Sequence, residues 1–369
     1  MLFRGGHKSG IKDDMGAVVS RERSRNRKRP VDNHNVTLYG FMMIYESTEK
    51  KKASLDKHRP LPEDLVRNLE EWFRIELTYT SNAIEGNTLT RRETALVVEK
   101  GITVGGKSLA EHLEACNHAE ALDWVKAQVK RKPHQISVHD MLHIHNLILK
   151  GIDDAHAGHF RSVPVRVSGS TVVFPNPRKV PDLMDELCGW LSERPKLHPI
   201  ELAAEAHYRL VTIHPFVDGN GRTARLLMNM ILMMNGYPPA IIRKRDRLSY
   251  IDSLEKAQLG GSKEAYLRLI GKSVNRSLDI YLKAVLGTGE GASETDSDIL
   301  LKIGELAKRV EEPNSTIRHW TKEGLLEVAA TTASGYQMYS VDMIRRVEAI
   351  KALKKKRLTL EEIRIELSK

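Results

Sequence analysis

A run of twelve residues, His214–Arg225, combines residue types that can do chemistry on a phosphate. His214 follows an apolar helical pattern and can take a proton near neutral pH. Gly219 and Gly221 allow the backbone to turn its N–H groups inward. The next helical pattern starts there, and its positive dipole end faces the same place. These features predict a base beside an anion site at the start of a helix.

Three charged side chains complete this loop. Asp218 offers one hard carboxylate, a ligand type that suits Mg²⁺. Arg222 and Arg225 share one helical face, where two like charges repel unless an anion lies between them. A base, a metal ligand, an anion site and two cations are together typical of nucleotidyl or phosphoryl transfer.

The segment 219–224 also fits the dinucleotide-binding spacing G-x-G-x-x-A. That interpretation requires a preceding strand. The residues before His214 instead repeat with a helical period, and so do those after Arg225. We therefore expect two core helices joined by a tight loop, which disfavours a dinucleotide site.

The run His214–Arg225 matches the Fic family motif HPFx[DE]GN[GK]RxxR at every fixed position, and the chain resembles this family over residues 62–285. The resemblance implies a mainly α fold: a Fic-type helical core with a small β-hairpin flap. It also implies a protein adenylyltransferase that uses ATP and Mg²⁺, and Gly221 favours AMP transfer over phosphorylation. By resemblance His214 is the catalytic base and Asp218 the Mg²⁺ ligand. The implied ATP-binding residues are Asp218, Gly219, Asn220, Gly221, Arg222, Arg225 and Tyr250.

A helix predicted over residues 62–86 ends in Ser81-Asn-Ala-Ile-Glu85-Gly86. Glu85 lies at the unfavourable end of the helix dipole, where a cation would stabilise it. The segment resembles the inhibitory motif [ST]xxxE[GN] of Fic proteins. The resemblance implies that Glu85 pairs with Arg225 in place of the ATP γ-phosphate. In some Fic proteins this glutamate helps to remove AMP instead, so the sequence leaves the direction open.

Two β-rich runs flank a Gly/Ser turn within residues 158–177 and predict a hairpin. In Fic proteins a hairpin flap at this place holds the target by strand addition, which implies a target hydroxyl near His214. Tyr250 and Gln258 lie where the family lines its adenine pocket. Family members often have Asn at the second position, so Gln258 is a departure.

The composition indicates a cytoplasmic, mainly helical protein. Among its 369 residues the aromatic ones are few, whereas Leu, Ala, Glu and Lys are many. The two cysteines, Cys116 and Cys188, form no framework and fit a reducing compartment. The longest apolar run, 226–234, is too short to span a membrane, and no signal peptide is visible.

The net charge of +10 is concentrated at the two ends. Residues 1–60 hold 14 Lys/Arg and 7 Asp/Glu, and residues 299–369 hold 14 and 10. The first segment is predicted to be a basic, disordered tail. A nucleic-acid-binding arm and translated sequence upstream of a later start are the alternatives.

We expect a Fic domain over residues 61–285, a linker over 286–298 and a separate domain over 299–369. The last domain shows helix, turn, helix and then a hairpin wing, and it resembles a MerR-type winged helix-turn-helix. In that family the second helix enters the major groove and the wing holds phosphates. The corresponding residues here are Thr316, Arg318, His319 and Tyr336.

Three functions therefore compete. The first is AMP transfer to a Ser, Thr or Tyr hydroxyl of a target protein or of the chain itself, restrained by Glu85. The second is removal of AMP at the same site. The third is regulation by DNA binding through 299–369, with a Fic domain that mainly modifies itself; a protein-recognition module is the alternative for this domain. Many Fic proteins are dimers, so the resemblance also implies a homodimer.

Overall fold

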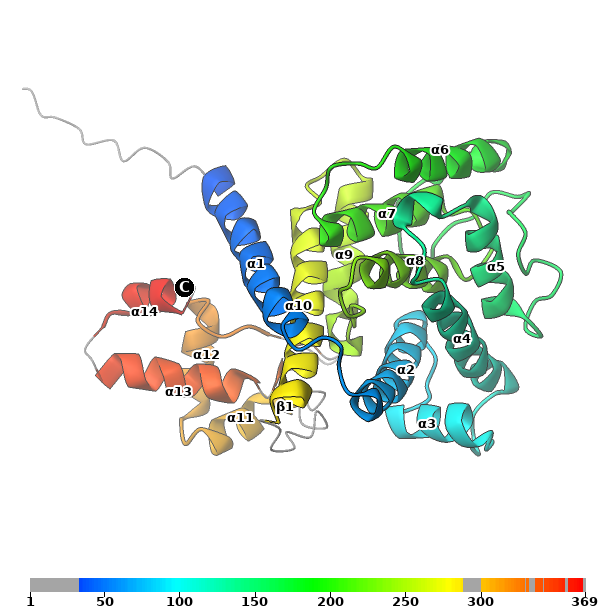
Figure 1. Ribbon diagram of the computed structural model, residues 1–369. Helices are drawn as coiled ribbons and strands as arrows, with labels where there is room; N and C mark the ends of the chain where they lie inside the picture. Colours follow the sequence, from blue (N-terminus) through cyan, green and yellow to red (C-terminus); the bar gives the residue numbers. More distant parts are fainter. Residues whose placement is uncertain are drawn as a thin grey trace, which may run out of the picture. The chain divides into compact units, whose positions relative to one another are not determined.

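The computed structural model describes residues 33–287, 300–328, 330–331, 336–340, 342–355 and 358–367. Most of them are helical (Figure 1). The helices before residue 288 are α1 (Asn33–Asp56), α2 (Glu63–Glu85), α3 (Arg91–Lys100), α4 (Leu109–Ala127), α5 (Val138–Leu149), α6 (Val180–Ser192), α7 (Pro199–Ile213), α8 (Asn220–Met234), α9 (Arg247–Gln258) and α10 (Glu264–Leu286). Short 3₁₀ helices occupy Pro133–Gln135, Pro177–Lys179 and Lys244–Asp246.

The helix ends follow from local sequence. Capping boxes begin α3, α4 and α5, with Thr90, Ser108 and Ser137 as the capping residues. Gly86 ends α2 in the left-handed conformation, with φ of 108°. The helices predicted around the inhibitory segment and the motif are therefore confirmed.

The centre of the core is α8. Every side chain from Leu226 to Leu232 is at most 3% exposed, because α7, α4, α5 and α2 surround this helix (Figure 1). A helix that is apolar all round must be buried. The loop between α7 and α8 is therefore anchored at both ends in the best-packed part of the molecule.

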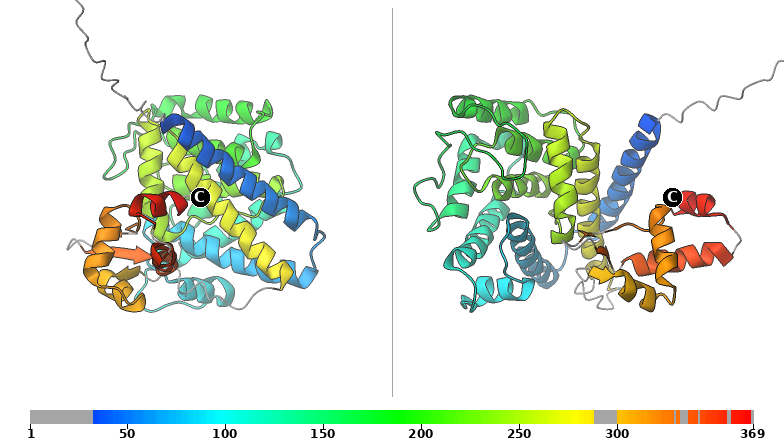
Figure 2. Two further views of the ribbon diagram at one scale, coloured as in Figure 1. Left: turned by 90° about the vertical axis from the view of Figure 1, so that its left-hand side faces the viewer. Right: turned by 180° about the vertical axis from the view of Figure 1, so that it is seen from behind.

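The predicted disordered tail over residues 1–60 is wrong for residues 33–56, which form α1. Leu55 is fully buried in the core, and the ring of Tyr45 stacks on His198 at 4.3 Å. Lys51 forms an ion pair of 2.7 Å with Asp279 of α10, beside which this part of α1 lies (Figure 2). Polar and aromatic contacts make this interface, so no apolar stripe marks it in the sequence. Residues 1–32 lie outside the described residues.

The predicted β-hairpin flap is instead an extended loop, without strand pairing over residues 158–177. The chain reverses at a turn closed by the Ser170 N–H and the Val167 carbonyl, 3.1 Å apart. Gly169 has φ of 80° at this turn, a value that glycine adopts without strain. Prolines in both arms remove backbone donors that a strand ladder needs.

Residues 300–367 contain a small winged helix-turn-helix with a core of its own, built around Trp320, Ile317 and Tyr339. Its elements are β1 (Leu300–Lys302), α11 (Ile303–Arg309), α12 (Asn314–Lys322), β2 (Ala330–Thr331), β3 (Gln337–Ser340), α13 (Asp342–Lys355) and α14 (Leu360–Glu366). The strands form one antiparallel sheet in the order β1-β3-β2. The predicted helix-turn-helix and wing are confirmed, and β1 is an additional strand.

Within the described ranges, no helix combines the length and the apolar character needed to cross a membrane. Most of the predicted linker, residues 288–298, lies outside these ranges.

Candidate active site

The loop after α7 has a fixed, compact backbone. His214 caps α7 in the left-handed conformation, with φ of 51°, and Gly219 precedes α8 with φ of 76°. The Asn220 side chain accepts from the Phe216 N–H through Oδ1 and donates to the Phe216 carbonyl through Nδ2, each at 2.9 Å. The first intrahelical bond of α8 runs from the Thr223 N–H to the Gly219 carbonyl. The three N–H groups before Thr223 therefore have no partner within the helix.

The His214 ring is held in its neutral form. Its Nδ1–H donates to the Val211 carbonyl at 3.2 Å, and the ring stacks on Phe174 at 4.0 Å. Burial lowers the pKa of His214 to about 4, and the charge of Arg161 acts in the same direction. The imidazole is therefore uncharged at neutral pH, and its Nε2 carries the free lone pair.

Arg161 ties the flap to the catalytic loop. Its Nε–H donates to the carbonyl of His214 at 2.7 Å. The rest of the guanidinium donates to the Val163 carbonyl at 3.1 Å and to the Pro175 carbonyl at 2.7 Å. Arg161 is only 2% exposed, so one buried side chain joins both arms of the flap to the base.

His145 of α5 packs against the loop between α7 and α8, a role that the sequence did not indicate. Its ring stacks on Phe216 at 3.6 Å and bonds the Asp218 carbonyl at 3.0 Å through Nε2. Its Nδ1 accepts from the Gly158 N–H at 3.0 Å. A Cβ on Gly219 would lie 3.2 Å from the His145 ring, a tight contact that adds to the preference for glycine set by its φ of 76°.

Arg222 lies between two carboxylates. It donates to Asp218 Oδ2 at 3.0 Å and to Glu114 Oε1 at 3.1 Å, and it is 2% exposed. Its Nε–H is buried without an acceptor among the described residues. Glu114 of α4 lies 108 positions away in the sequence, and no sequence pattern connects it to the motif.

Glu85 and Arg225 are brought together as the sequence analysis expected. The Glu85 Oε1 accepts from Arg225 Nη2 at 2.7 Å. Arg225 also donates to the hydroxyl and the carbonyl of Ser81, both at 2.9 Å. A Cβ on Gly221 would lie 2.3 Å from Glu85 Oε1. The Glu85 carboxylate thus lies against the first turn of α8, where the sequence predicts an anion.

The end of α2 is fixed by polar contacts at two residues just before Glu85. Asn82 donates to the Glu114 carbonyl at 3.1 Å, and Arg247 donates to the Ile84 carbonyl at 2.6 Å. Helix α2 therefore presents Glu85 to the motif from a defined position.

A cavity of about 160 Å³ lies beside His214 and Arg225. Tyr250 and Gln258 line it, as the sequence analysis expected. Gln258 Nε2 donates to the Val211 carbonyl at 3.2 Å. Ligand pockets typically measure about 300–1,000 Å³, so the site is small while Glu85 occupies it. The other residues that line this cavity are Ile84, Glu85, Val167, Ser170, Phe174, Val211, Gly221, Ile251, Leu254 and Glu255.

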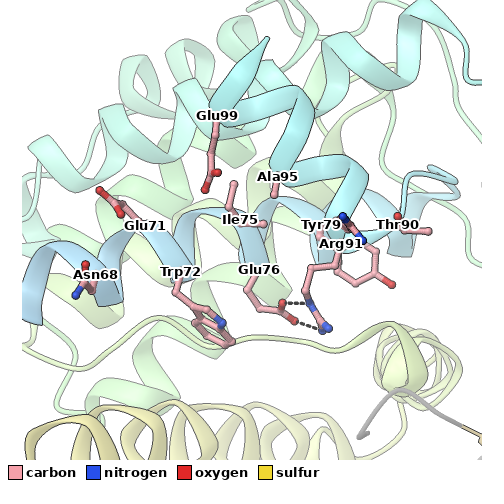
Figure 3. A pocket seen from close by; sticks show the side chains of 11 residues that line it. Asn68, Glu71, Trp72, Ile75, Glu76, Tyr79, Thr90, Arg91, Ala95 and Glu99 are labelled. Atoms are coloured by element: carbon pink, nitrogen blue, oxygen red, sulfur yellow. Dashed lines mark hydrogen bonds and ion pairs between the residues drawn. The ribbon is translucent and has the colours of Figure 1, made fainter. Parts of the chain in front are cut away.

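A larger cavity of about 660 Å³ lies between α2 and α3 (Figure 3). Trp72, Ile75 and Tyr79 line it, next to the ion pair of Glu76 with Arg91. Neither Glu85 nor any residue of the motif lines this cavity. The motif residues His214, Gly221 and Arg225 instead line the smaller cavity.

The predicted DNA-contacting residues lie on the outer face of the C-terminal domain. Arg318 and His319 of α12 are exposed, whereas their neighbours Ile317 and Trp320 are 0% and 2% exposed. Thr316 is half-buried, and Tyr336 next to β3 is 64% exposed. The helix therefore presents a polar face on which the basic side chains of Arg318, His319 and Lys322 are exposed.

Comparison with known proteins agrees with this geometry. A model of the Fic/DOC family matches residues 135–232, and a model of MerR HTH family regulatory proteins matches residues 301–369. The protein adenylyltransferase Fic of Nematostella vectensis is 45% identical over 274 residues, which cover 73% of this chain and 60% of that protein. The corresponding protein of Culex quinquefasciatus is 39% identical over 242 residues, which cover 65% of this chain and 48% of that protein.

The chain thus spans about half to three fifths of the length of these curated relatives. Among solved structures, Fic-1 from Caenorhabditis elegans superposes with a TM-score of 0.62 at 30% identity, covering 70% of this chain and 75% of that chain. With its motif, its fold and these relatives, the chain belongs to the Fic/DOC family.

Proposed function

We propose that this chain transfers AMP from ATP to a Ser, Thr or Tyr hydroxyl of a target protein or of itself, and that Glu85 restrains the reaction. The observation that carries the proposal is the convergence of His214, the first turn of α8 and Arg225 on one cavity. The relatives named protein adenylyltransferase Fic support it.

His214 acts as the general base. Its Nδ1–H is engaged with Val211, so Nε2 takes the proton of the target hydroxyl. The hydroxyl oxygen forms a bond to the α-phosphorus of ATP. The bond from that phosphorus to the bridging oxygen breaks, and pyrophosphate leaves with the electron pair. AMP is then joined to the target, and His214 releases the proton to solvent.

The first turn of α8 holds the phosphates. Its free N–H groups and positive dipole end favour an anion, and Arg222 and Arg225 add two buried positive charges. The side chain of Asn220 is committed to Phe216. We therefore assign phosphate binding at Asn220 to the backbone N–H.

Asp218 is the residue that would hold Mg²⁺. Its side chain is 69% exposed, and it receives Arg222 on Oδ2, which leaves Oδ1 for a cation. The described residues contain no group of three ligand side chains. Mg²⁺ often uses one or two carboxylates with substrate phosphates, so this single carboxylate beside the phosphate site fits. When bound, Mg²⁺ supplies positive charge against the phosphates.

Glu85 restrains transfer because its carboxylate occupies the place of a phosphate. It pairs with Arg225 and lies against Gly221, so a nucleotide must displace it to place all its phosphates there. The same carboxylate could orient a water molecule for AMP removal. The two directions share one site and differ in what Glu85 does.

Label transfer tests the proposal. The parent, Glu85→Gly and His214→Ala proteins are incubated with Mg²⁺ and ATP labelled at the α- or the γ-phosphate. We expect α-label on protein, strongest in Glu85→Gly and absent in His214→Ala. Label from γ alone would indicate a kinase. Loss of AMP from a pre-modified protein, without α-label in any sample, would indicate the removing direction.

A second function, DNA binding by the C-terminal domain, is favoured by the match to MerR regulators and by the exposed basic face of α12. Phosphate contacts and base contacts both require such exposed side chains. The contacting residues would be Thr316, Arg318, His319 and Tyr336.

A gel-shift experiment with the full chain tests this second function. Arg318→Ala should weaken binding to a preferred sequence, whereas Arg364→Ala on α14 of the same domain should not. Binding that is salt-sensitive but indifferent to sequence, and equal for both variants, would argue against a regulator. A homodimer, as the resemblance implies, stays a prediction.

A further inference from the structure

A line of buried hydrogen bonds leads into the core through three aromatic side chains and starts at Tyr250, which lines the same cavity as Arg225. Tyr250, His207 and Tyr266 are 3%, 0% and 0% exposed. The Tyr250 phenol interacts with the charged Arg225 at the cavity that both residues line. Tyr250 bonds His207 Nε2 at 2.7 Å, and His207 Nδ1 bonds Tyr266 at 2.8 Å. The line ends at the Ala204 carbonyl of α7. The transfer reaction as described above gives a role to Arg225 but to none of these three aromatic side chains.

The donor and the acceptor of each bond in this line follow from its inner end, at Tyr266 and the Ala204 carbonyl. The Tyr266 hydroxyl donates to the Ala204 carbonyl at 2.9 Å, because a carbonyl can only accept. Its oxygen must therefore accept from His207, which places the imidazole proton on Nδ1. Burial lowers the pKa of His207 to about 3, so the ring is neutral and carries one N–H.

The direction at Tyr250 follows from this tautomer. The bare Nε2 of His207 can only accept, so the Tyr250 hydroxyl donates to it. The lone pairs of the Tyr250 oxygen then remain for Arg225, whose guanidinium has only donors. The opposite tautomer would donate to Tyr250 and turn the phenol hydrogen toward Arg225, placing two donors against each other.

We propose that His207 and Tyr266 are positioning residues: they hold Tyr250 as a hydrogen-bond acceptor and thereby orient Arg225 toward its anion. The anion is Glu85 in the present arrangement, and an ATP phosphate when Glu85 is displaced. The orientation of Arg225 toward an ATP phosphate rests on the proposed function. When Glu85 leaves, the two oxygens of Ser81 still accept from the guanidinium. With the Tyr250 oxygen as a further acceptor, Arg225 is already oriented for the nucleotide.

Tyr266→Phe separates this role from simple packing, because it removes one oxygen and keeps the ring. His207 Nδ1–H then loses its acceptor, and the other tautomer becomes favourable. The matched control is Tyr208→Phe on α7. The Tyr208 hydroxyl also donates to a backbone carbonyl, that of Ala257 at 3.1 Å, but it does not belong to the line.

The first test reads the tautomer by ¹⁵N NMR of histidine-labelled full chain, with His207 assigned through His207→Gln. We expect a protonated Nδ1 and a bare Nε2 in the parent and in Tyr208→Phe, and a protonated Nε2 in a measurable fraction of Tyr266→Phe. A protonated Nε2 in the parent would overturn the proposal. This readout needs neither ATP nor activity.

The second test measures ATP binding with Mg²⁺ by calorimetry in the Glu85→Gly/His214→Ala background, where transfer is blocked. Tyr266→Phe should raise the ATP Kd by about 2- to 10-fold, the effect of one ordinary hydrogen bond. Tyr208→Phe should leave the Kd within about 2-fold. Equal Kd values for both variants would refute the link to Arg225. A background protein that binds no ATP at all would refute the proposed function, while the tautomer test would still decide the first part.

Discussion

The carboxylate of Glu85 lies against the backbone of Gly221, so close that a Cβ on that glycine would be 2.3 Å from Glu85 Oε1. The last residue of α2 therefore occupies the anion site at the first turn of α8. There its carboxylate also accepts a hydrogen bond from the Arg225 guanidinium. Removing the carboxylate, filling its space and titrating the base beside it should each have a distinct effect.

Glu85→Gly should raise AMP incorporation strongly, on the order of 10-fold or more, because the phosphate site and Arg225 become available together. The measurement is α-label on protein over time. Glu71→Gly is the control: it places the same change in the exposed middle of α2, costs the helix about 1 kcal/mol and leaves the Arg225 pair intact. Equal activation by both variants would show that loosening of α2, and not loss of the carboxylate, releases the site.

Gly221→Ala should weaken ATP binding in the Glu85→Gly background, because the added methyl group occupies the space into which the phosphates must fit. It should therefore not imitate Glu85→Gly, although it also pushes the Glu85 carboxylate away. Calorimetry with ATP and Mg²⁺ measures the effect. Gly189→Ala is the matched control, since nothing lies within 4 Å of a Cβ there. An unchanged ATP Kd in Gly221→Ala would place the phosphates elsewhere.

The rate of AMP transfer should not fall between pH 8 and about pH 5 through titration of the base. Burial lowers the pKa of His214 to about 4, so Nε2 keeps its lone pair over this range. Single-turnover labelling by Glu85→Gly across this range measures it. An acidic limb centred near pH 6.5, the ordinary value for histidine, would show that His214 is not buried as a neutral base in the working enzyme.

Stability should decline on the acid side through four buried neutral histidines. Burial lowers the pKa of His118 and His207 to about 3, and of His145 and His214 to about 4. Below about pH 6.5 the unfolded chain binds protons that the folded chain does not, so the free energy of unfolding falls with pH down to about 4. Urea unfolding at several pH values measures this fall. His207→Gln should reduce the slope, whereas replacement of the exposed His156 should not.

Glu255 should control the tip of the flap. Its Oε1 accepts from the Ser170 hydroxyl at 2.9 Å and from the Thr171 N–H at 3.0 Å. Glu255→Ala should speed hydrogen exchange at the Thr171 amide and raise the KM for the protein target more than that for ATP. Glu255→Gln keeps an acceptor oxygen and should have the smaller effect. Unchanged exchange in Glu255→Ala would mean that Arg161 alone holds the flap.

The sequence by itself determined the parts that depend on local patterns. The helical periods around His214–Arg225 and the helix-turn-helix pattern near the C-terminus predicted their elements, because a helical period acts within a few residues. The motif also predicted a base at His214 and an anion site beside Arg222 and Arg225. The inhibitory motif predicted the Glu85–Arg225 pair, although 140 positions separate the two residues.

Only the tertiary structure decided the contacts between distant segments that carry no motif. Glu114 meets Arg222 across 108 positions, His145 supports Phe216, and Arg161 replaces the strand ladder expected in the flap. Helix α1 was missed because polar contacts, not an apolar stripe, hold it in place. Such contacts depend on which side chains the packing of α7 and α8 brings together. A one-dimensional pattern records the period of each helix and not its neighbours.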